Sequence, residues 1–208
     1  MRSTVTCRPT RPTVEPLTPR RPHDRHLLAL AREPWVLRVD RTPLVVRPST
    51  PRDLAAVARM HHRCTARSLL DRYRAGGRPL AVAAIDHLLR RPDTVVAAAP
   101  NGEVVALATL ERDAGHHHFC AEVGLLVEDR WQRLGIGTEL MSHLAGVAQA
   151  SGYHELIAYP ATAMTAAQRL LLEVGRTRVV PDADTHLHTY LPESAALGLG
   201  SVRRRLAG

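Results

Sequence analysis

The residues with the clearest chemical meaning are Gln132–Gly137, which read Gln-Arg-Leu-Gly-Ile-Gly between an apolar stretch and a long amphipathic one. Glycine lets the backbone approach a ligand closely, and the first N–H groups of a helix have no partners within it. These groups also lie at the positive end of the helix dipole. The pattern therefore predicts a main-chain site for an anion such as a phosphate, with Arg130 and Arg133 adding positive charge beside it.

Two other interpretations of this segment compete with the anion site. The first is a helix that merely begins with glycines. The second is a dinucleotide-binding fingerprint, but Gly135 and Gly137 lack the third glycine and the early strand–helix–strand location of that motif. The placement directly between a strand and a strong helix favours the phosphate site.

Glu122 is the one acid within the apolar stretch that leads to these glycines. A carboxylate in an apolar strand is costly unless water or a partner reaches it. In the alternation of a strand, Glu122 shares its side with Cys120 and Gly124. The residue is either a functional acid or base or an ordinary solvent-facing strand position.

Histidines and cysteines offer weaker signals. His116–His118 are three consecutive residues, which cannot all face one metal ion from an extended chain. His186 and His188 alternate onto one face of a strand, where either could handle protons or simply be half-exposed. The three cysteines, Cys7 among them, have no metal-type spacing, and no Cys–His nucleophile arrangement is recognisable. We therefore expect no metal, and free thiols in a reducing compartment.

The composition narrows the function classes. The net charge is +8, but all 28 basic residues are arginine, as in proteins from GC-rich genomes. This origin, together with only 3% aromatic residues, argues against a nucleic-acid partner. No apolar run approaches the ~20 residues of a membrane span, and no signal peptide is evident. The sequence thus predicts a soluble, cytoplasmic protein.

The elements that would position these residues follow from periodicity and turn residues. A hairpin is expected around Asp40-Arg41, then helices opened by Thr50-Pro51 and continuing to residue 90. Three strands then lead to the long helix 135–150. A strand, a helix and a final strand pair complete the order. The expected strands are 35–39, 43–47, 94–99, 103–111, 118–127, 156–159, 178–181 and 186–191. The expected fold class is α+β, with a mixed, mostly antiparallel central sheet flanked by helices.

The segment Gln132–Gly137 after a strand matches the acyl-CoA-binding motif of the GNAT N-acetyltransferases, (Gln/Arg)-x-x-Gly-x-(Gly/Ala). The resemblance extends over residues 43–193, from the first strand to the final strand pair. The helices around Met60–Tyr73 and the pair Ala121-Glu122 look most like the protein-lysine acetyltransferases of the Pat type. The chain is therefore divided into a Pro/Arg-rich extension (1–42), a GNAT domain (43–193) and a basic tail (194–208).

The resemblance implies acetyl-CoA as co-substrate and an amine, on a protein lysine or a small molecule, as acceptor. The strand would offer main-chain groups to the pantetheine arm, a backbone N–H near Leu125 would polarise the acetyl carbonyl, and Glu122 would be the general base. The implied cofactor contacts are Leu125, Leu126, Val127, Gln132, Arg133, Leu134, Gly135, Ile136, Gly137 and Thr138.

Three departures from the family pattern leave the general acid open. Leu172 stands where the family usually has a tyrosine, Met164 near its asparagine, and Arg176 in place of an aromatic residue. Tyr159, at the end of the neighbouring strand, is the candidate donor to the leaving thiolate. Two alternatives stay open: a non-catalytic acetyl-CoA-binding regulatory domain, and a nucleic-acid-associated protein. A homodimer through the first hairpin is also compatible with the sequence.

Overall fold

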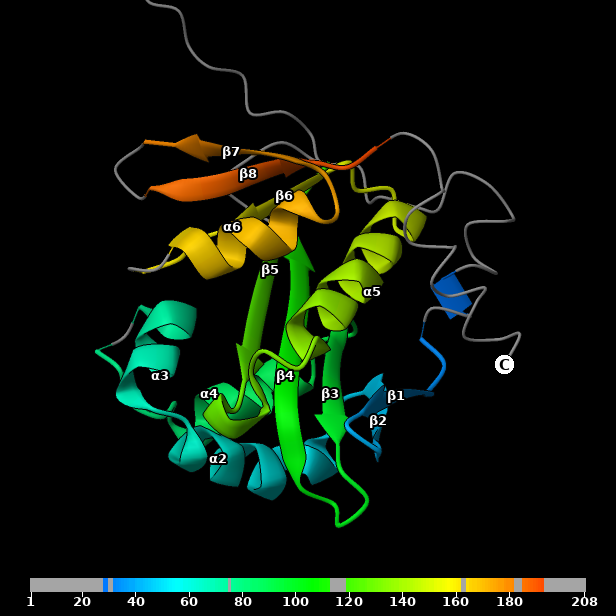
Figure 1. Cartoon of the computed structure of the whole chain (residues 1–208), viewed down its shortest axis with the longest axis vertical. Helices are drawn as coiled ribbons and strands as arrows, with labels where there is room; N and C mark the ends of the chain where they lie inside the picture. The colour runs from blue at the N-terminus through cyan, green and yellow to red at the C-terminus, as the bar shows by residue number, and fades with distance from the viewer. Residues whose placement is uncertain are drawn as a thin grey trace, which may run out of the picture.

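The computed structural model describes residues 28–29, 32–74, 76–112, 119–161, 164–181 and 185–192, with the backbone alone for 164 and 165. Figure 1 shows how the strands and helices of this part of the chain are arranged. The strands are β1 (Trp35–Val39), β2 (Thr42–Pro48), β3 (Thr94–Ala98), β4 (Val104–Arg112), β5 (Cys120–Val127), β6 (Glu155–Ala158), β7 (Arg176–Val180) and β8 (His186–Tyr190). The helices are α2 (Leu54–Arg63), α3 (Ala66–Tyr73), α4 (Val82–Leu89), α5 (Ile136–Ala150) and α6 (Met164–Leu172), with 3₁₀ turns η1 (Pro51–Asp53) and η2 (Asp129–Trp131).

The eight described strands form one sheet in the order β1-β2-β3-β4-β5-β6-β8-β7. Neighbouring strands are antiparallel everywhere except between β5 and β6, which are parallel because α5 connects them as a crossover. The mixed, mostly antiparallel sheet flanked by helices confirms the predicted fold class.

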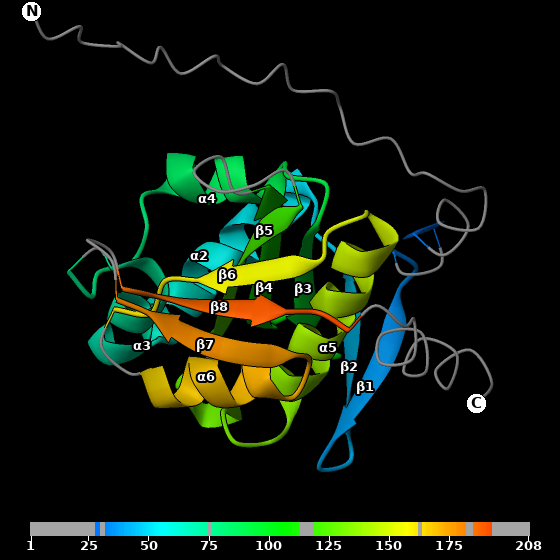
Figure 2. The same cartoon turned by 90° about the horizontal axis from the view of Figure 1, so that it is seen from above.

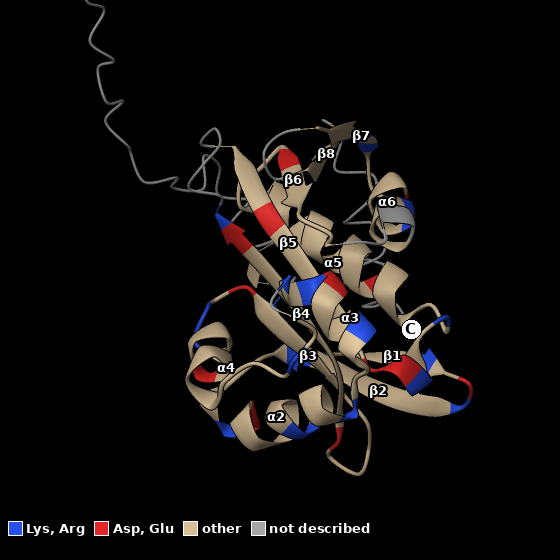
Figure 3. Ribbon diagram, turned by 90° about the vertical axis from the view of Figure 1, so that its left-hand side faces the viewer, with Lys and Arg blue, Asp and Glu red and all other residues tan. Residues whose placement is uncertain are grey.

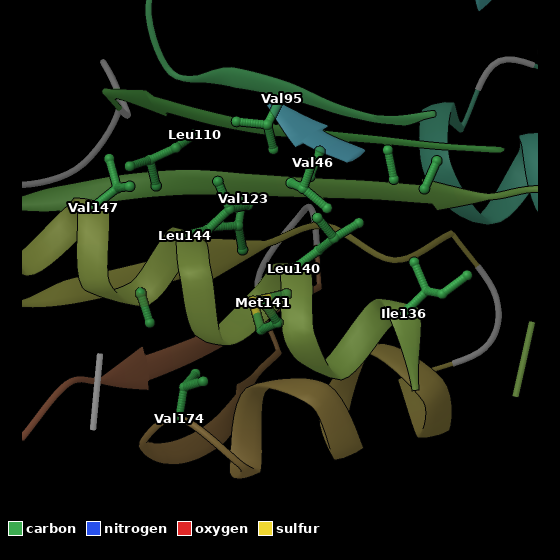
Figure 4. Packing of buried hydrophobic residues seen from close by; sticks show 14 of the residues in the cluster. Val46, Val95, Leu110, Val123, Ile136, Leu140, Met141, Leu144, Val147 and Val174 are labelled. Carbon is green, nitrogen blue, oxygen red and sulfur yellow. The ribbon is translucent and has the colours of Figure 1, made fainter. Parts of the chain in front are cut away.

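Helices cover both faces of the sheet (Figure 1). On one face, α2, α3 and α4 enclose a core that includes Met60, Leu69 and Ile85. On the other face, α5 and α6 pack on the larger core. Figure 4 shows Ile136, Leu140, Leu144 and Val147 of α5 pointing at the strands, and each is at most 3% exposed. Burying one such side chain stabilises a fold by about 1.5–3 kcal/mol, so α5 is firmly anchored.

The sheet opens between β5 and β6. These strands pair only where Cys120–Glu122 lie beside Glu155–Ile157, and β5 then continues from Val123 to Val127 without a neighbour on that side. Figure 2 shows β6, β8 and β7 running across the direction of β3, β4 and β5. Alternate main-chain groups of the last five residues of β5 therefore face an opening rather than another strand.

The first hairpin forms as predicted. Asp40 and Arg41 have φ values of 43° and 70°, and a two-residue loop of this kind matches the twist of its strands. Strand β1 thereby becomes the edge of the same sheet, so the predicted boundary at residue 43 falls one residue into β2 and divides two paired strands. The three-domain division and the homodimer stay predictions.

Several sequence features lie outside the described residues: the proline-rich arm, His116–His118 and the terminal arginines. Within the described part of the chain, no helix is long and apolar enough to cross a membrane.

Candidate active site

A cavity of about 680 Å³ lies where β5 separates from β6. One end is formed by β5 and the turn into α5, one wall by α3, and the other by β6 and α6. Figure 3 shows acidic colouring on the β5 ribbon and charged positions on the neighbouring α3. The residues around the cavity are Ser68, Asp71, Arg72, Glu122–Val127, Gln132, Arg133, Gly135, Gly137, Thr138, Met141, Ala158–Pro160, Ala166, Ala167, Arg169–Leu171 and Glu173.

The turn that begins α5 supplies main-chain donors to this cavity. The first N–H bonded in the helical pattern is that of Glu139, which donates to the Gly135 carbonyl at 3.1 Å. The amides of residues 136–138 precede it and have no acceptor within the helix. Arg133 (φ 60°) and Gly135 (φ 82°) both adopt left-handed conformations, which curve the backbone into a concave set of N–H groups. The geometry suits an anion.

Gly137 leaves room for a slender ligand beside this turn. A Cβ at this position would lie 3.4 Å from the Leu125 Cδ2 atom and 3.5 Å from the Leu170 Cδ atoms. Any larger side chain would fill the space between α5, β5 and α6. With Met141 also lining the cavity, the walls here are apolar and suited to an extended chain of mixed polarity.

The side chain of Gln132 has a positioning role. Its Nε2 donates to the Val127 carbonyl at 2.9 Å and to Ser68 Oγ at 3.1 Å, which ties the end of β5 to α3. Asp129 reinforces this junction, because its carboxylate accepts bonds from the backbone and hydroxyl of Thr65, both at 2.8 Å, and from Ser68 Oγ at 2.9 Å. Burial raises the pKa of Asp129, but these bonds outweigh it and hold the pKa below its usual range.

Glu122 lines the cavity and is half-buried, at the last position where β5 still pairs with β6. Its neighbour across the β4 ladder is Glu111, which forms an ion pair with Arg91. That pairing offsets the repulsion expected between like charges on adjacent strands. Glu122 thus lies at the cavity, and its role as a base stays a prediction.

Arg72 of α3 lies over β5 at Gly124. A Cβ at Gly124 would collide with the guanidinium, so the glycine makes room for it. The Arg72 Nη2 donates to Thr109 Oγ1 at 2.8 Å, whereas its buried Nε has no hydrogen-bond partner among the described residues. Sequence analysis missed Arg72, since nothing in an arginine-rich helix distinguishes one arginine from another.

Tyr73, the residue after Arg72 in α3, is partly buried and is held by the buried His61 of α2. The carbonyl of Val57 can only accept, so His61 Nδ1, 2.8 Å away, carries the proton. His61 Nε2 then accepts from the Tyr73 hydroxyl at 2.7 Å. Burial lowers the pKa of His61 and raises the pKa of Tyr73 to about 12, so both stay neutral. The Arg72 guanidinium stands 4.8 Å from the Tyr73 ring centre, next to this pair.

The remaining predicted residues are placed as follows. Tyr159 lines the cavity, and its ring centre is 5.4 Å from that of His186. Leu172 is 52% exposed, and α6 lines the cavity instead with residues that include Leu170 and Leu171. Leu134 and Ile136 do not line the cavity with their side chains, since Leu134 is 39% exposed and Ile136 belongs to the core.

Solved structures with a similar fold include the GNAT domain of S. lividans PAT, with 23% identity over 76% of this chain and 97% of that one (TM-score 0.65). A phosphinothricin acetyltransferase from Sinorhizobium meliloti in complex with acetyl-CoA has 19% identity over 74% and 91% (TM-score 0.55). The yncA protein from Salmonella typhimurium, with its cofactor acetyl-CoA, has 19% identity over 74% and 96% (TM-score 0.54).

The likeness to the PAT domain agrees with the Pat-type resemblance of the sequence. Comparison of the sequence with curated proteins finds no match. The model of the acetyltransferase (GNAT) family matches residues 57–175, which include most of α2, together with β5, the turn at Gln132–Gly137, α5 and α6. The chain belongs to the acetyltransferase (GNAT) family.

Proposed function

We propose that the protein transfers an acetyl group from acetyl-CoA to a primary amine by direct attack in a ternary complex. The observation that carries the proposal is a single cavity with two features. The main-chain N–H groups at the start of α5, which suit an anion, lie at the same cavity as Glu122 on β5. The activity is assigned to residues 43–193, with residues 1–42 as an extension and 194–208 as a basic tail. Two structures of similar fold contain acetyl-CoA, which supports the same co-substrate here.

The residues present fit such a thioester. The amides at the start of α5 and the Arg133 side chain would hold the diphosphate. The space that a side chain at Gly137 would fill, between Leu125 and Leu170, suits the pantetheine arm. The open edge of β5 offers main-chain groups to that arm and to the acetyl carbonyl. In this arrangement the diphosphate of acetyl-CoA would lie at the start of α5, and its acetyl group would lie near Glu122.

The reaction balances as follows. The amine nitrogen attacks the thioester carbon, so that a C–N bond forms and the C–S bond breaks. An alkyl ammonium has a pKa of about 10.4, so a base must take its proton, and Glu122 performs this role directly or through a water. The sulfur leaves with the bonding electron pair, and Tyr159 or solvent returns a proton to it. A thiol has a pKa of about 8.5, so the proton transfer to the sulfur is easier than the removal of the proton from the ammonium.

The acceptor end holds a cation as well as the proposed base. Arg72 and Glu122 both line the cavity, and the Arg72 guanidinium lies over Gly124, two residues along β5 from Glu122. A guanidinium that lines a cavity is a suitable partner for a carboxylate, which it binds through charge-assisted hydrogen bonds. We infer that the preferred acceptors are small amines that carry a carboxylate near the amino group, rather than protein lysines.

The test is turnover with a panel of amines, followed by the release of coenzyme A, together with acetyl-CoA binding by calorimetry. The panel contains amino acids, their amides, simple alkylamines and lysine peptides. Acetyl-CoA binding with turnover of at least one amine supports the proposal. Binding without any responsive amine would favour the non-catalytic regulatory reading, and the lack of acetyl-CoA binding would refute both.

A further inference from the structure

A second cluster of reactive side chains lies beside the cavity on the same sheet. Cys120 of β5, Glu155 of β6 and His188 of β8 converge on one point. The Cys120 Sγ and the His188 Nε2 each lie 2.8 Å from the Glu155 Oε2. The three atoms all lie within 4.8 Å of one another.

Strand register brings these residues together. Cys120 is directly opposite Glu155, and His188 is opposite Ile157, two residues along β6 on the same face. The three residues therefore share one face of three adjacent strands, at the end where β5 and β6 are still paired. Glu122 lies on this face too, next to Ile157.

We propose that Cys120, Glu155 and His188 bind one divalent transition-metal ion of the Zn²⁺ class. Thiolate and imidazole ligands select Zn²⁺ over Mg²⁺ and Ca²⁺, which prefer oxygen alone. A thiolate and a carboxylate together neutralise the ion, which suits a site where Cys120 is 0% and His188 6% exposed. Three protein ligands leave a fourth coordination position for water or another group.

The geometry requires only a small adjustment. Bond lengths of about 2.0–2.1 Å to oxygen and nitrogen place tetrahedral ligand atoms about 3.3 Å apart. The Glu155 oxygen and His188 nitrogen, at 2.8 Å, would separate by rotation of the side chains. Binding would replace the two hydrogen bonds and release the thiol proton.

The site is additional to acetyl transfer, whose steps here use no metal. An ion at this point would fasten β5, β6 and β8 together at the base of the opening, two residues from Glu122. The sequence could not reveal it, because Glu155 is 35 residues from Cys120 and 33 from His188. These three residues therefore do not form a short sequence motif of the kind that marks many zinc sites.

Cobalt(II) titration of the chelator-treated full chain tests the proposal. We expect one equivalent to bind, with the intense visible bands of a tetrahedral ion and a thiolate-to-cobalt charge-transfer band in the near ultraviolet. Zn²⁺ should displace it and raise the Tm. The absence of a stoichiometric thiolate-bound cobalt spectrum in the wild-type chain would overturn the proposal, whatever the variants do.

Variants then assign the ligands. Cys120→Ser should remove the charge-transfer band, and Glu155→Gln and His188→Gln should each weaken Zn²⁺ binding by more than about 100-fold. Cys64→Ser and Cys7→Ser are matched controls that should keep the band. Burial and the nearby Asp129 raise the pKa of Cys64 to about 12, which disfavours the thiolate that a metal would bind. A band that survives Cys120→Ser, or disappears with Cys64→Ser, would place the metal elsewhere and refute this site.

Discussion

The two ends of the cavity are built on different principles. The end at the start of α5 is made of main-chain groups, held by left-handed conformations at Arg133 and Gly135. The acceptor end is made of side chains from separate elements, Arg72 on α3 and Glu122 on β5. An invariant co-substrate can be bound by a backbone shape, whereas the choice of acceptor and the removal of a proton require particular functional groups. Substitutions should therefore separate co-substrate binding from turnover.

The largest expected effect comes from Glu122, the proposed base. Glu122→Gln keeps the size of the side chain but cannot take a proton, so kcat should fall by about 10²–10⁴-fold. The affinity for acetyl-CoA should be unchanged, as measured by calorimetry. Glu173→Gln, which alters another carboxylate of the cavity, should retain most of the turnover. Unchanged kcat in Glu122→Gln would remove the base from the mechanism.

The main-chain end should respond in the opposite way. Gly137→Val fills the space beside Leu125 and Leu170, so acetyl-CoA should bind about 100-fold more weakly, a loss of about 2.7 kcal/mol. Gly135→Ala should also weaken binding, because φ is 82° there.

Gly152→Ala is the matched control for Gly135→Ala. Its φ is 85°, and it likewise has open space around a new Cβ, but it lies at the far end of α5. Both alanine variants should lose similar stability in thermal unfolding. Equal acetyl-CoA affinity in the two would contradict the anion site at the start of α5.

Arg72 offers a smaller effect that discriminates between acceptors. Arg72→Met removes the charge, and Gly124→Ala displaces the guanidinium while keeping it. Both should raise KM at least about tenfold for amines that carry a carboxylate, since a charge-assisted hydrogen bond contributes about 1.5–3 kcal/mol. Uncharged amines should lose little. A uniform loss across the panel would make Arg72 structural rather than selective.

How much of the site was predictable depends on how local each part is. The turn at Gln132–Gly137 was found from the sequence, because a single contiguous segment folds into it between a strand and a helix. The order of the elements along the chain and the long helix α5 followed similarly from periodicity. Glu122 was found because an acid stands out in an apolar strand, and its place at the cavity agrees with that reasoning.

Other parts depended on tertiary contacts that no local pattern encodes. Arg72 reaches Gly124 across more than fifty residues of chain, and the sequence shows only an amphipathic helix at that point. The Cys120–Glu155–His188 cluster depends on the register of three strands. The sequence predicted Gln132 as a cofactor contact. The motif did not indicate that its side chain joins the end of β5 to α3.

The smallest expected effect concerns the support of the acceptor wall. Burial lowers the pKa of His61 below its ordinary value of 6.5, because the folded protein holds the ring neutral between Val57 and Tyr73. The unfolded chain therefore binds more protons, and the free energy of unfolding falls as pH drops from 6.5 toward the folded pKa.

Urea unfolding at several pH values should show this loss of stability. His61→Gln, whose side chain has no titrating group, should show less of it. Because His61 and Tyr73 adjoin Arg72 and not the α5 turn, acidification below the folded pKa, where the His61 ring takes up a proton, should weaken acceptor binding before acetyl-CoA binding. The reverse order would mean that α3 supports the co-substrate end as strongly as the acceptor end, and the division between the two ends would fail.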